Sequence, residues 1–398
     1  MGGDSLDLLN QTATPAIIVV AYNRPKSLAR LLNSLSKADY PGATAVPLVI
    51  SIDGGGDLGD EVGRIAHDFV WEFGEKEIVA HGDNLGLIGH VFVCGDLSDR
   101  FGAIVLLEDD LMVGKAFYRY AQQAAGFYRS DPNIAGISLS ALWFHGFTQL
   151  PFTPYLDGGD SFFMQIAWYQ GQVYTAEQWD KFRAWLAQDE GGQTTLPYMH
   201  PMFSQFPATD WFPLKTRYLV ETGRFYAFPR ESVAVNFGEM GTHFAKQTPF
   251  FQVPLQEHQH RWNFYSLADC LAVYDSWQEM LPSRLKRLLP ELAEVDFETD
   301  FYGERGLNRV QAEFLLTTQP SDKPVRSWGL VMRPPVANLI HDVGGGEICL
   351  VRPDGVKTGG VTRLIADWKR WAYFSRYRPM GRWRRVQLWV GRWLNRRL

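Results

Sequence analysis

From residue 16 to about residue 130, short and continuously apolar runs alternate with stretches in which apolar residues recur every three or four positions. The apolar runs are typical of strands buried in a parallel sheet, and the recurring pattern is typical of helices packed on such a sheet. We expect strands at 16–21, 46–52, 77–80 and 103–107, and helices at 27–35, 61–73, 88–97 and 117–128. This alternation predicts an α/β fold with a mostly parallel, Rossmann-like sheet flanked by helices.

After about residue 135 the pattern changes to short strands and aromatic-rich loops, which we interpret as an extension that completes a binding pocket. We expect helices at 176–187 and across 268–294, the second one interrupted by Pro282 and Pro290, and short strands at 327–332 and 347–351. The predicted domains are a core over 1–245 with halves at 15–140 and 141–245, a helical and short-strand extension over 246–362, and a basic tail over 363–398.

Three of the expected strands end in polar residues: Tyr22-Asn23-Arg24, Asp53 and Glu108-Asp109-Asp110. Ligands of parallel α/β sheets bind beyond the carboxyl ends of the strands, so these residues are expected to converge at one site. Neighbouring carboxylates are unfavourable unless a cation lies between them, and Mg²⁺ or Mn²⁺ prefers such oxygen ligands. The triplet therefore predicts a metal site, and a solvated acidic turn is the alternative.

Asp53 and Arg24 have a structural and a functional interpretation each. Asp53 is suited to accept a hydrogen bond from a ribose or a base, or it is a turn residue before three glycines. Arg24 is suited to meet a base edge or a phosphate, or it is a surface arginine at the start of a helix.

The segments IIVVAYNRPKSLARLLNSL, SIDGG and VLLEDDLMV resemble GT-A-type glycosyltransferases. They are most similar to bacterial family 2-like enzymes and to the N-acetylglucosaminyltransferase I group, in which an EDD replaces the usual DXD. The resemblance covers residues 15–140 well and continues more loosely through 208–244.

The resemblance implies a role for each matching position. Ala21, Tyr22, Arg24 and Asp53 would hold the nucleotide, Asp110 would bind the metal, and Glu108 and Asp109 would lie nearer the sugar and ribose. Asp210 would deprotonate the acceptor hydroxyl, and His243 would contact the diphosphate or the metal. This chain departs from some relatives at Glu239-Met240, where an acid followed by a small residue is common. From the residues alone, Asp210 is equally a helix N-cap and His243 a loop histidine.

These features predict an inverting, metal-dependent glycosyltransferase of the hexosyltransferase class, with Mn²⁺ or Mg²⁺ and a nucleotide-sugar donor, a UDP-sugar being favoured. The expected acceptor is a glycan or a lipid-linked glycan in bacterial surface polysaccharide biosynthesis. A sugar nucleotidyltransferase is one alternative, although YNRPKS lacks the glycines of a phosphate loop. A non-catalytic glycan- or membrane-binding protein on a degenerate fold is another.

Charge is distributed unevenly along the chain, whose net charge is −5. Residues 363–398 contain 11 of the 39 Lys and Arg and one of the 44 Asp and Glu, together with five Trp. From Arg382 onward the spacing predicts an amphipathic helix that lies in an anionic membrane surface, with packing on the domain as the alternative. The acidic remainder disfavours nucleic-acid binding.

The three scattered cysteines have no metal-ligand spacing and favour a reducing compartment. We find neither a signal-peptide pattern nor an apolar run of about 20 residues. We therefore expect a cytoplasmic protein, peripheral on the inner face of the membrane.

Overall fold

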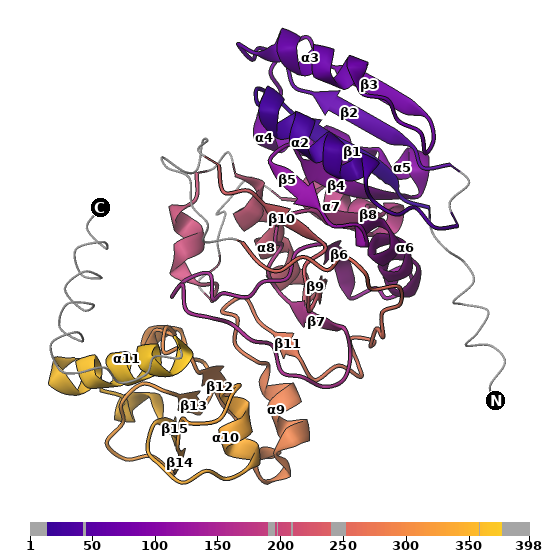
Figure 1. Ribbon diagram of the computed structural model, residues 1–398. Helices are drawn as coiled ribbons and strands as arrows, with labels where there is room; N and C mark the ends of the chain where they lie inside the picture. Colours follow the sequence, from indigo (N-terminus) through magenta and orange to yellow (C-terminus); the bar gives the residue numbers. More distant parts are fainter. Residues whose placement is uncertain are drawn as a thin grey trace, which may run out of the picture. The chain divides into compact units, whose positions relative to one another are not determined.

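The computed structural model describes residues 14–42, 45–189, 196, 198–207, 210–239, 252–357 and 359–375 (Figure 1). The chain forms two compact units, one from residues 1–143 and 154–293 and the other from 144–153 and 294–398. The main division of the structure thus lies between residues 293 and 294. From the sequence we expect domain boundaries at 245 and 362, and these stay predictions.

The first unit contains a nine-stranded sheet with the order β11-β7-β9-β6-β8-β4-β1-β2-β3. Its N-terminal strands are parallel and are β1 (Ala16–Ala21), β2 (Leu48–Ile52), β3 (Lys76–Ala80) and β4 (Ala103–Glu108). All residues of β1 and β2 are buried, as continuous apolar strands between two helical layers should be. The prediction of a mostly parallel α/β sheet flanked by helices is confirmed.

The rest of the sheet joins β4 through an antiparallel neighbour, β8 (Gln172–Thr175). Beyond it lie β6 (Ile134–Ser138), β9 (Phe225–Pro229), β7 (Ser161–Met164) and β11 (Val273–Tyr274). A separate two-stranded ribbon pairs β5 (Leu111–Val113) with β10 (Ala234–Asn236) in antiparallel fashion. This ribbon brings the chain around residue 236 to the end of β4, which carries the acidic triplet.

Helices cover both faces of the sheet. On one face lie α2 (Pro25–Ser36), α3 (Gly59–Asp68) and α6 (Phe117–Tyr128). On the other face lie α4 (Gly86–Asp96), α5 (Ser98–Phe101), α7 (Ala176–Ala187) and α8 (Trp211–Thr222). The bounds of α6 and α7 agree with the sequence prediction, and α7 begins with a capping box formed by Thr175 and Gln178.

Two helix predictions need correction. The helix expected over 61–73 ends at Asp68, because Phe69 adopts an extended conformation. The segment 268–281 contains β11 and turns instead of helix, and the helix of this region is α9 (Pro282–Leu288), followed by a 3₁₀ turn over Pro290–Leu292. Pro282 begins a helix because proline lacks the amide hydrogen that a first-turn residue leaves unpaired.

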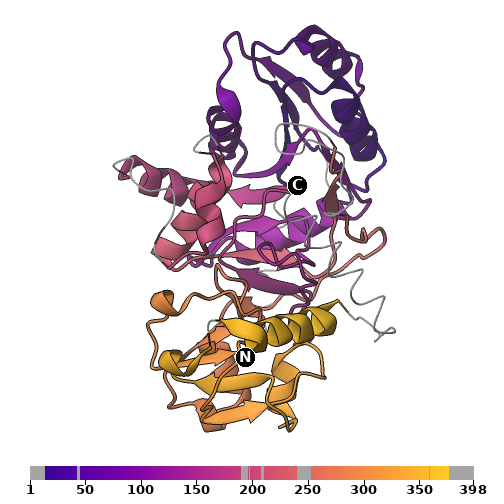
Figure 2. The same ribbon diagram turned by 90° about the vertical axis from the view of Figure 1, so that its left-hand side faces the viewer.

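The second unit contains a four-stranded sheet with the order β12-β13-β15-β14. Its elements are β12 (Phe297–Asp300), β13 (Phe314–Thr317), β14 (Arg326–Trp328), α10 (Val336–Ile340), β15 (Ile348–Val351) and α11 (Gly360–Phe374). Figure 2 shows α11 running along the surface of this unit.

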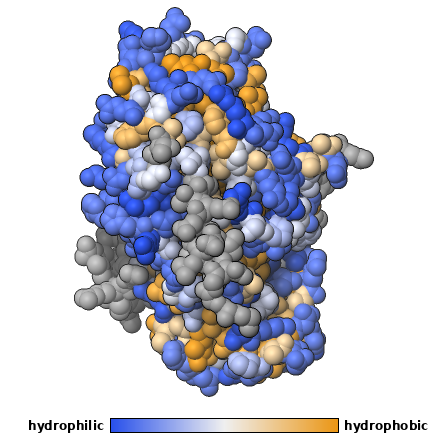
Figure 3. Space-filling view, turned by 90° about the vertical axis from the view of Figure 1, so that its right-hand side faces the viewer, coloured by the Kyte–Doolittle hydropathy of each residue, from blue (hydrophilic) through white to orange (hydrophobic). Residues whose placement is uncertain are grey.

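None of the helices in the described part of the chain has the length and apolar character that crossing a membrane requires. On the face drawn in Figure 3, hydrophobic residues gather in patches that hydrophilic residues separate.

Candidate active site

The acidic triplet lies where the sequence predicts it, at the carboxyl end of β4. Glu108 ends the strand, and Asp109 and Asp110 form the turn that leads into β5. The amide of Asp109 donates a hydrogen bond of 3.1 Å to the Val20 carbonyl, and its carboxylate accepts one of 3.4 Å from the Tyr22 amide. The ends of β4 and β1 are therefore joined at the site.

Arg24 supplies a positive charge to these acids. Its Nη1 atom lies 2.7 Å from Oδ2 of Asp110 and 3.9 Å from Oδ1 of Asp109. Burial alone lowers the pKa of Arg24, but the carboxylates of Asp110, Asp109 and Glu108 outweigh it and raise the pKa above the usual value. Arg24 lies at the start of α2 and is paired with the acidic triplet, and its contact with a base edge or a phosphate stays a prediction.

The two inner acids are strongly perturbed. Surrounding protein raises the pKa of Glu108 well above its ordinary value, and the charges of Asp110 and Asp109 raise it further. Burial also raises the pKa of Asp109, to about 7, although the Arg24 guanidinium lowers it. Crowded carboxylates with perturbed pKa values are typical of sites that bind a cation or move a proton.

Asp210 lies close enough to the triplet for its charge to raise the pKa of Glu108. Its carboxylate also caps α8, because Oδ1 accepts a hydrogen bond of 2.9 Å from the Phe212 amide. The structure therefore bears out the N-cap interpretation and also brings Asp210, about 100 residues away in sequence, to the acids. A general-base role for Asp210 stays a prediction.

Tyr169 is a further residue of the site, and no motif in the sequence marks it. Burial raises the pKa of this phenol, and the charges of Glu108, Asp210 and Asp110 raise it further, so the hydroxyl belongs to the same cluster. The ring packs on Phe212, with 5.2 Å between centroids. Its only sequence signal was membership of an aromatic-rich stretch, which also describes many core positions.

Asp53 lies at the end of β2 and holds the start of α4. Its Oδ1 atom accepts hydrogen bonds from the amides of Gly54 (2.9 Å) and Leu85 (2.8 Å), and its Oδ2 atom accepts one from Gly86 (3.1 Å). Its own amide donates to the carbonyl of Ala21. These contacts agree with the turn interpretation, and contact with a ribose stays a prediction.

Tyr22 extends from the end of β1, and its side chain is exposed. Its hydroxyl accepts a hydrogen bond of 3.2 Å from Nδ2 of Asn84, which lies in the loop before α4. The pair spans the carboxyl ends of the N-terminal strands, the position expected for a nucleotide.

Glu239 has structural partners of its own. Its carboxylate accepts hydrogen bonds from both terminal nitrogens of Arg30 (2.7 and 2.8 Å) and from the Ser27 hydroxyl (2.5 Å). These bonds with Arg30, assisted by Ser27, lower the pKa of Glu239 to about 2. The Arg30 guanidinium also stacks 3.8 Å from the ring centre of Phe237. These contacts of Glu239 and Phe237 with α2, which we call the Glu239 clamp, fix the chain after β10. The other candidate residue of this region, His243, lies outside the described residues.

The residues present suit a hard divalent ion only in part. Among the described residues no three His, Cys, Asp or Glu side chains are arranged to hold a metal. Asp110 offers a partly exposed carboxylate, and proteins commonly bind Mg²⁺ through one or two carboxylates together with the phosphates of a substrate. The oxygen donors therefore fit an ion held largely by a bound diphosphate.

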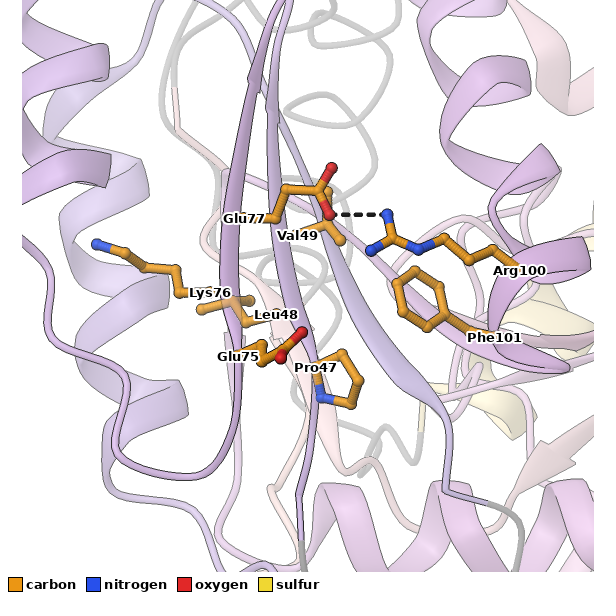
Figure 4. Close-up of a pocket in the computed structure, with 8 residues that line it drawn as sticks. All are labelled: Pro47, Leu48, Val49, Glu75, Lys76, Glu77, Arg100 and Phe101. Atoms are coloured by element: carbon orange, nitrogen blue, oxygen red, sulfur yellow. Dashed lines mark hydrogen bonds and ion pairs between the residues drawn. The ribbon is translucent and has the colours of Figure 1, made fainter.

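A separate pocket of about 260 Å³ lies at the opposite, amino-terminal side of β2 and β3 (Figure 4). Its lining includes Leu48, Lys76 and Phe101, and an ion pair joins Arg100 to Glu77 at 2.7 Å. It contains none of the predicted site residues.

No protein-family model matches this chain, and no curated protein does. Several solved structures are similar to part of it. S. aureus TarS aligns over 55% of this chain and 59% of its own, with 14% identity and a TM-score of 0.34. The mannosyltransferase PcManGT from Pyrobaculum calidifontis, in complex with GDP-Man and Mn²⁺, aligns over 60% and 64%, with 15% identity and a TM-score of 0.38.

GalNAc-T7 with UDP, GalNAc and Mn²⁺ aligns over 56% of this chain and 43% of its own, with 11% identity and a TM-score of 0.37. The aligned region spans less than two thirds of each of these structures. Similarity of this degree does not assign an activity, so a functional assignment has to rest on the residues of the site.

Proposed function

We propose that this protein is an inverting glycosyltransferase that uses a nucleotide-sugar donor, with a UDP-sugar favoured. The observation that carries the proposal is the convergence of Arg24, the acidic triplet and Asp210 beyond the carboxyl ends of β1 and β4. In parallel α/β sheets this edge binds ligands. The proposed acceptor is a glycan or a lipid-linked glycan of bacterial surface polysaccharide biosynthesis.

In the proposed reaction, Asp210 accepts the proton of an acceptor hydroxyl while that oxygen attacks the anomeric carbon. The bond from this carbon to the diphosphate oxygen breaks, the electron pair leaves with the nucleoside diphosphate, and the configuration inverts. Ala21, Tyr22 and Asp53 would line the nucleotide, and Arg24 would offset negative charge on the diphosphate.

Asp110, with His243 as a second candidate ligand, would hold Mn²⁺ or Mg²⁺. A bound divalent ion stabilises negative charge on a departing diphosphate. Glu108 and Asp109 would contact the donor sugar and ribose. The crowding of these acids supports the proposal, because a cation offsets both the burial and the mutual repulsion that raise their pKa values.

The test begins with UDP-, GDP-, CMP- and dTDP-sugars, with and without Mn²⁺, in thermal-shift and donor-hydrolysis assays. Asp110→Ala should abolish metal-dependent hydrolysis and weaken Mn²⁺ binding in calorimetry while leaving the circular dichroism spectrum unchanged. Asp39→Ala, which removes an exposed acid of the same unit, should behave like the parent protein. Unchanged turnover in Asp110→Ala would remove the metal assignment.

Asp210→Asn tests the base separately from the helix cap. Asparagine caps helices as well as aspartate does, so α8 should keep its stability while turnover falls by about 10²-fold or more. Donor binding should persist. Near-normal transfer by this variant would eliminate Asp210 as the base. Synthesis of a nucleotide-sugar by the parent protein, in place of sugar transfer, would favour a nucleotidyltransferase.

We further propose that the protein is cytoplasmic and attaches to the inner face of a membrane through the basic segment 363–398. The charge of this segment supports the attachment, since basic residues near an anionic bilayer contribute about 1 kcal/mol each.

A further inference from the structure

Helix α11 directs Arg363 and Arg370 toward the second unit, whereas Lys369 is exposed and pairs with Glu347. Arg363 donates hydrogen bonds to the Gln319 side chain and the Gly303 carbonyl, and Arg370, which is 5% exposed, donates to the Thr318 hydroxyl at 3.1 Å. Asp367 pairs with both arginines. These basic side chains hold the helix on the second unit, so they are not available to an external anionic partner.

The opposite side of α11 is apolar and faces outward. Val361, Leu364, Ile365 and Trp368 are 71%, 59%, 52% and 37% exposed. They follow the i, i+3, i+4, i+7 spacing that places side chains on one helix face. We call these four residues the outer face of α11. Three of the four, Val361, Leu364 and Ile365, are more than half exposed.

In an ordinary surface helix the apolar side faces the core and the charges face water. The end of α11 follows this rule, because Tyr373 and Phe374 are buried, but the outer face before it does not. Single exposed apolar residues are common, but a contiguous apolar stripe marks a surface that binds something. The inward hydrogen bonds fix the rotation of the helix, so the stripe cannot turn into the core without leaving the arginines unpaired.

The sequence that follows the helix indicates the partner. Residues 376–398 contain eight Arg, three Trp and no acidic residue. Such a charge favours an anionic surface, and tryptophan concentrates at the boundary between lipid head groups and acyl chains. An apolar stripe half a helix length before this segment, on the same α11 that leads into it, has the composition of a helix that lies in that boundary.

We propose that the outer face of α11 is a lipid contact and inserts into the surface of an anionic bilayer. This inference rests on the membrane attachment proposed above and deepens it. It assigns the apolar contact to four residues of a folded unit, and it excludes Arg363 and Arg370 from the lipid contact because they are paired within that unit.

The first experiment measures flotation of the full chain with vesicles made of equal parts phosphatidylcholine and phosphatidylglycerol. Leu364→Gln combined with Ile365→Gln should lower the vesicle partition coefficient by about tenfold or more, because two apolar side chains no longer leave water. Glutamine is a good helix former, so α11 should persist. The matched control is Val70→Gln with Leu156→Gln, two residues of the first unit that are 72% and 69% exposed, and it should bind like the parent chain.

The second experiment places an environment-sensitive NBD label at Ile365→Cys, since the three native cysteines are buried. Emission should be that of a water-exposed probe without vesicles and should shift to the blue when they are added. If the emission is already shifted to the blue before vesicles are added, another part of the chain, or a second copy, covers the outer face of α11. That result, or equal flotation of the glutamine variant and the parent chain, would overturn the proposal.

Donor hydrolysis without vesicles separates this inference from the catalytic proposal. The glutamine variant should hydrolyse the donor at the parent rate. If the parent chain itself turns over no donor, the glycosyltransferase proposal is wrong, but the result of the vesicle experiment is unaffected.

Discussion

Replacing Lys215 by methionine should stabilise the first unit. Lys215 lies on α8 with no exposed surface, and its amine has no hydrogen-bond partner among the described residues. Its Nζ atom faces the rings of Phe182 (3.6 Å), Trp179 (4.6 Å) and Tyr174 (4.7 Å). Burial lowers the pKa of this amine well below its ordinary value.

Two terms of opposite sign determine the size of the effect. An amine buried without a hydrogen bond costs about 1–3 kcal/mol, and methionine of similar length removes that cost. If the amine is charged, its cation–π attraction to the aromatic rings stabilises the folded state by about 2 kcal/mol. Because the lowered pKa favours the neutral form, we expect Lys215→Met to raise the free energy of unfolding by about 1–3 kcal/mol near pH 10, and by more at lower pH.

The pH dependence has a definite sign. Between the lowered folded pKa and the unfolded value near 10.4, the unfolded chain binds a proton that the folded chain does not. The stability of the parent protein should therefore rise with pH in this window, by about 1.4 kcal/mol per unit. In Lys215→Met this contribution disappears and the profile should be flatter.

Urea unfolding of both proteins from pH 6 to pH 10 provides the measurement. Lys37→Met, which removes an exposed lysine at the end of α2, is the control and should leave the profile unchanged. Parallel pH profiles, or a Lys215→Met protein less stable than the parent, would refute the reasoning and indicate a charged lysine held by the aromatic rings.

Two further predictions concern packing and the clamp beside the active site. Gly95→Ala should lower the free energy of unfolding by about 1–3 kcal/mol in a thermal or urea assay, because a β-carbon at this position of α4 would overlap the ring of Trp179. Glu239→Gln should weaken the dependence of stability on acid. The parent carboxylate, with its pKa lowered to about 2, contributes stability above pH 4.5 that is lost as the pH falls toward 2. The measurement is the free energy of unfolding between pH 2 and about pH 4.5 for the parent and the variant. If it changes with pH equally in both proteins, the bonds of Glu239 with Arg30 and Ser27 do not contribute to stability.

The buried strands of the first half could be predicted because their signal is local. β1 and β4 are continuous apolar runs, and a parallel sheet buried on both faces requires them. The acidic triplet could be placed for the same reason, since the end of a strand follows from its sequence. The helix expected over 268–294 failed because apolar spacing alone does not separate a helix from short strands and turns.

The remainder of the site depends on contacts between distant segments. Tyr169 joins the acids through the way its loop packs, which no local pattern encodes. The three backbone amides that bind Asp53 come from two different loops. Sequence reasoning could identify Asp53 as a polar strand end but could not determine that its carboxylate already has these partners.

The antiparallel pairing of β4 with β8 has a consequence for how the chain is made. During synthesis the parallel strands β1 to β4 are complete about 60 residues before β8 emerges. Until then the edge of β4 that pairs with β8, formed by Ile104, Val105 and Leu106, has no partner strand. An apolar strand edge left open invites pairing with another chain. A fragment that stops before residue 172 should therefore aggregate, even though it carries every predicted nucleotide contact.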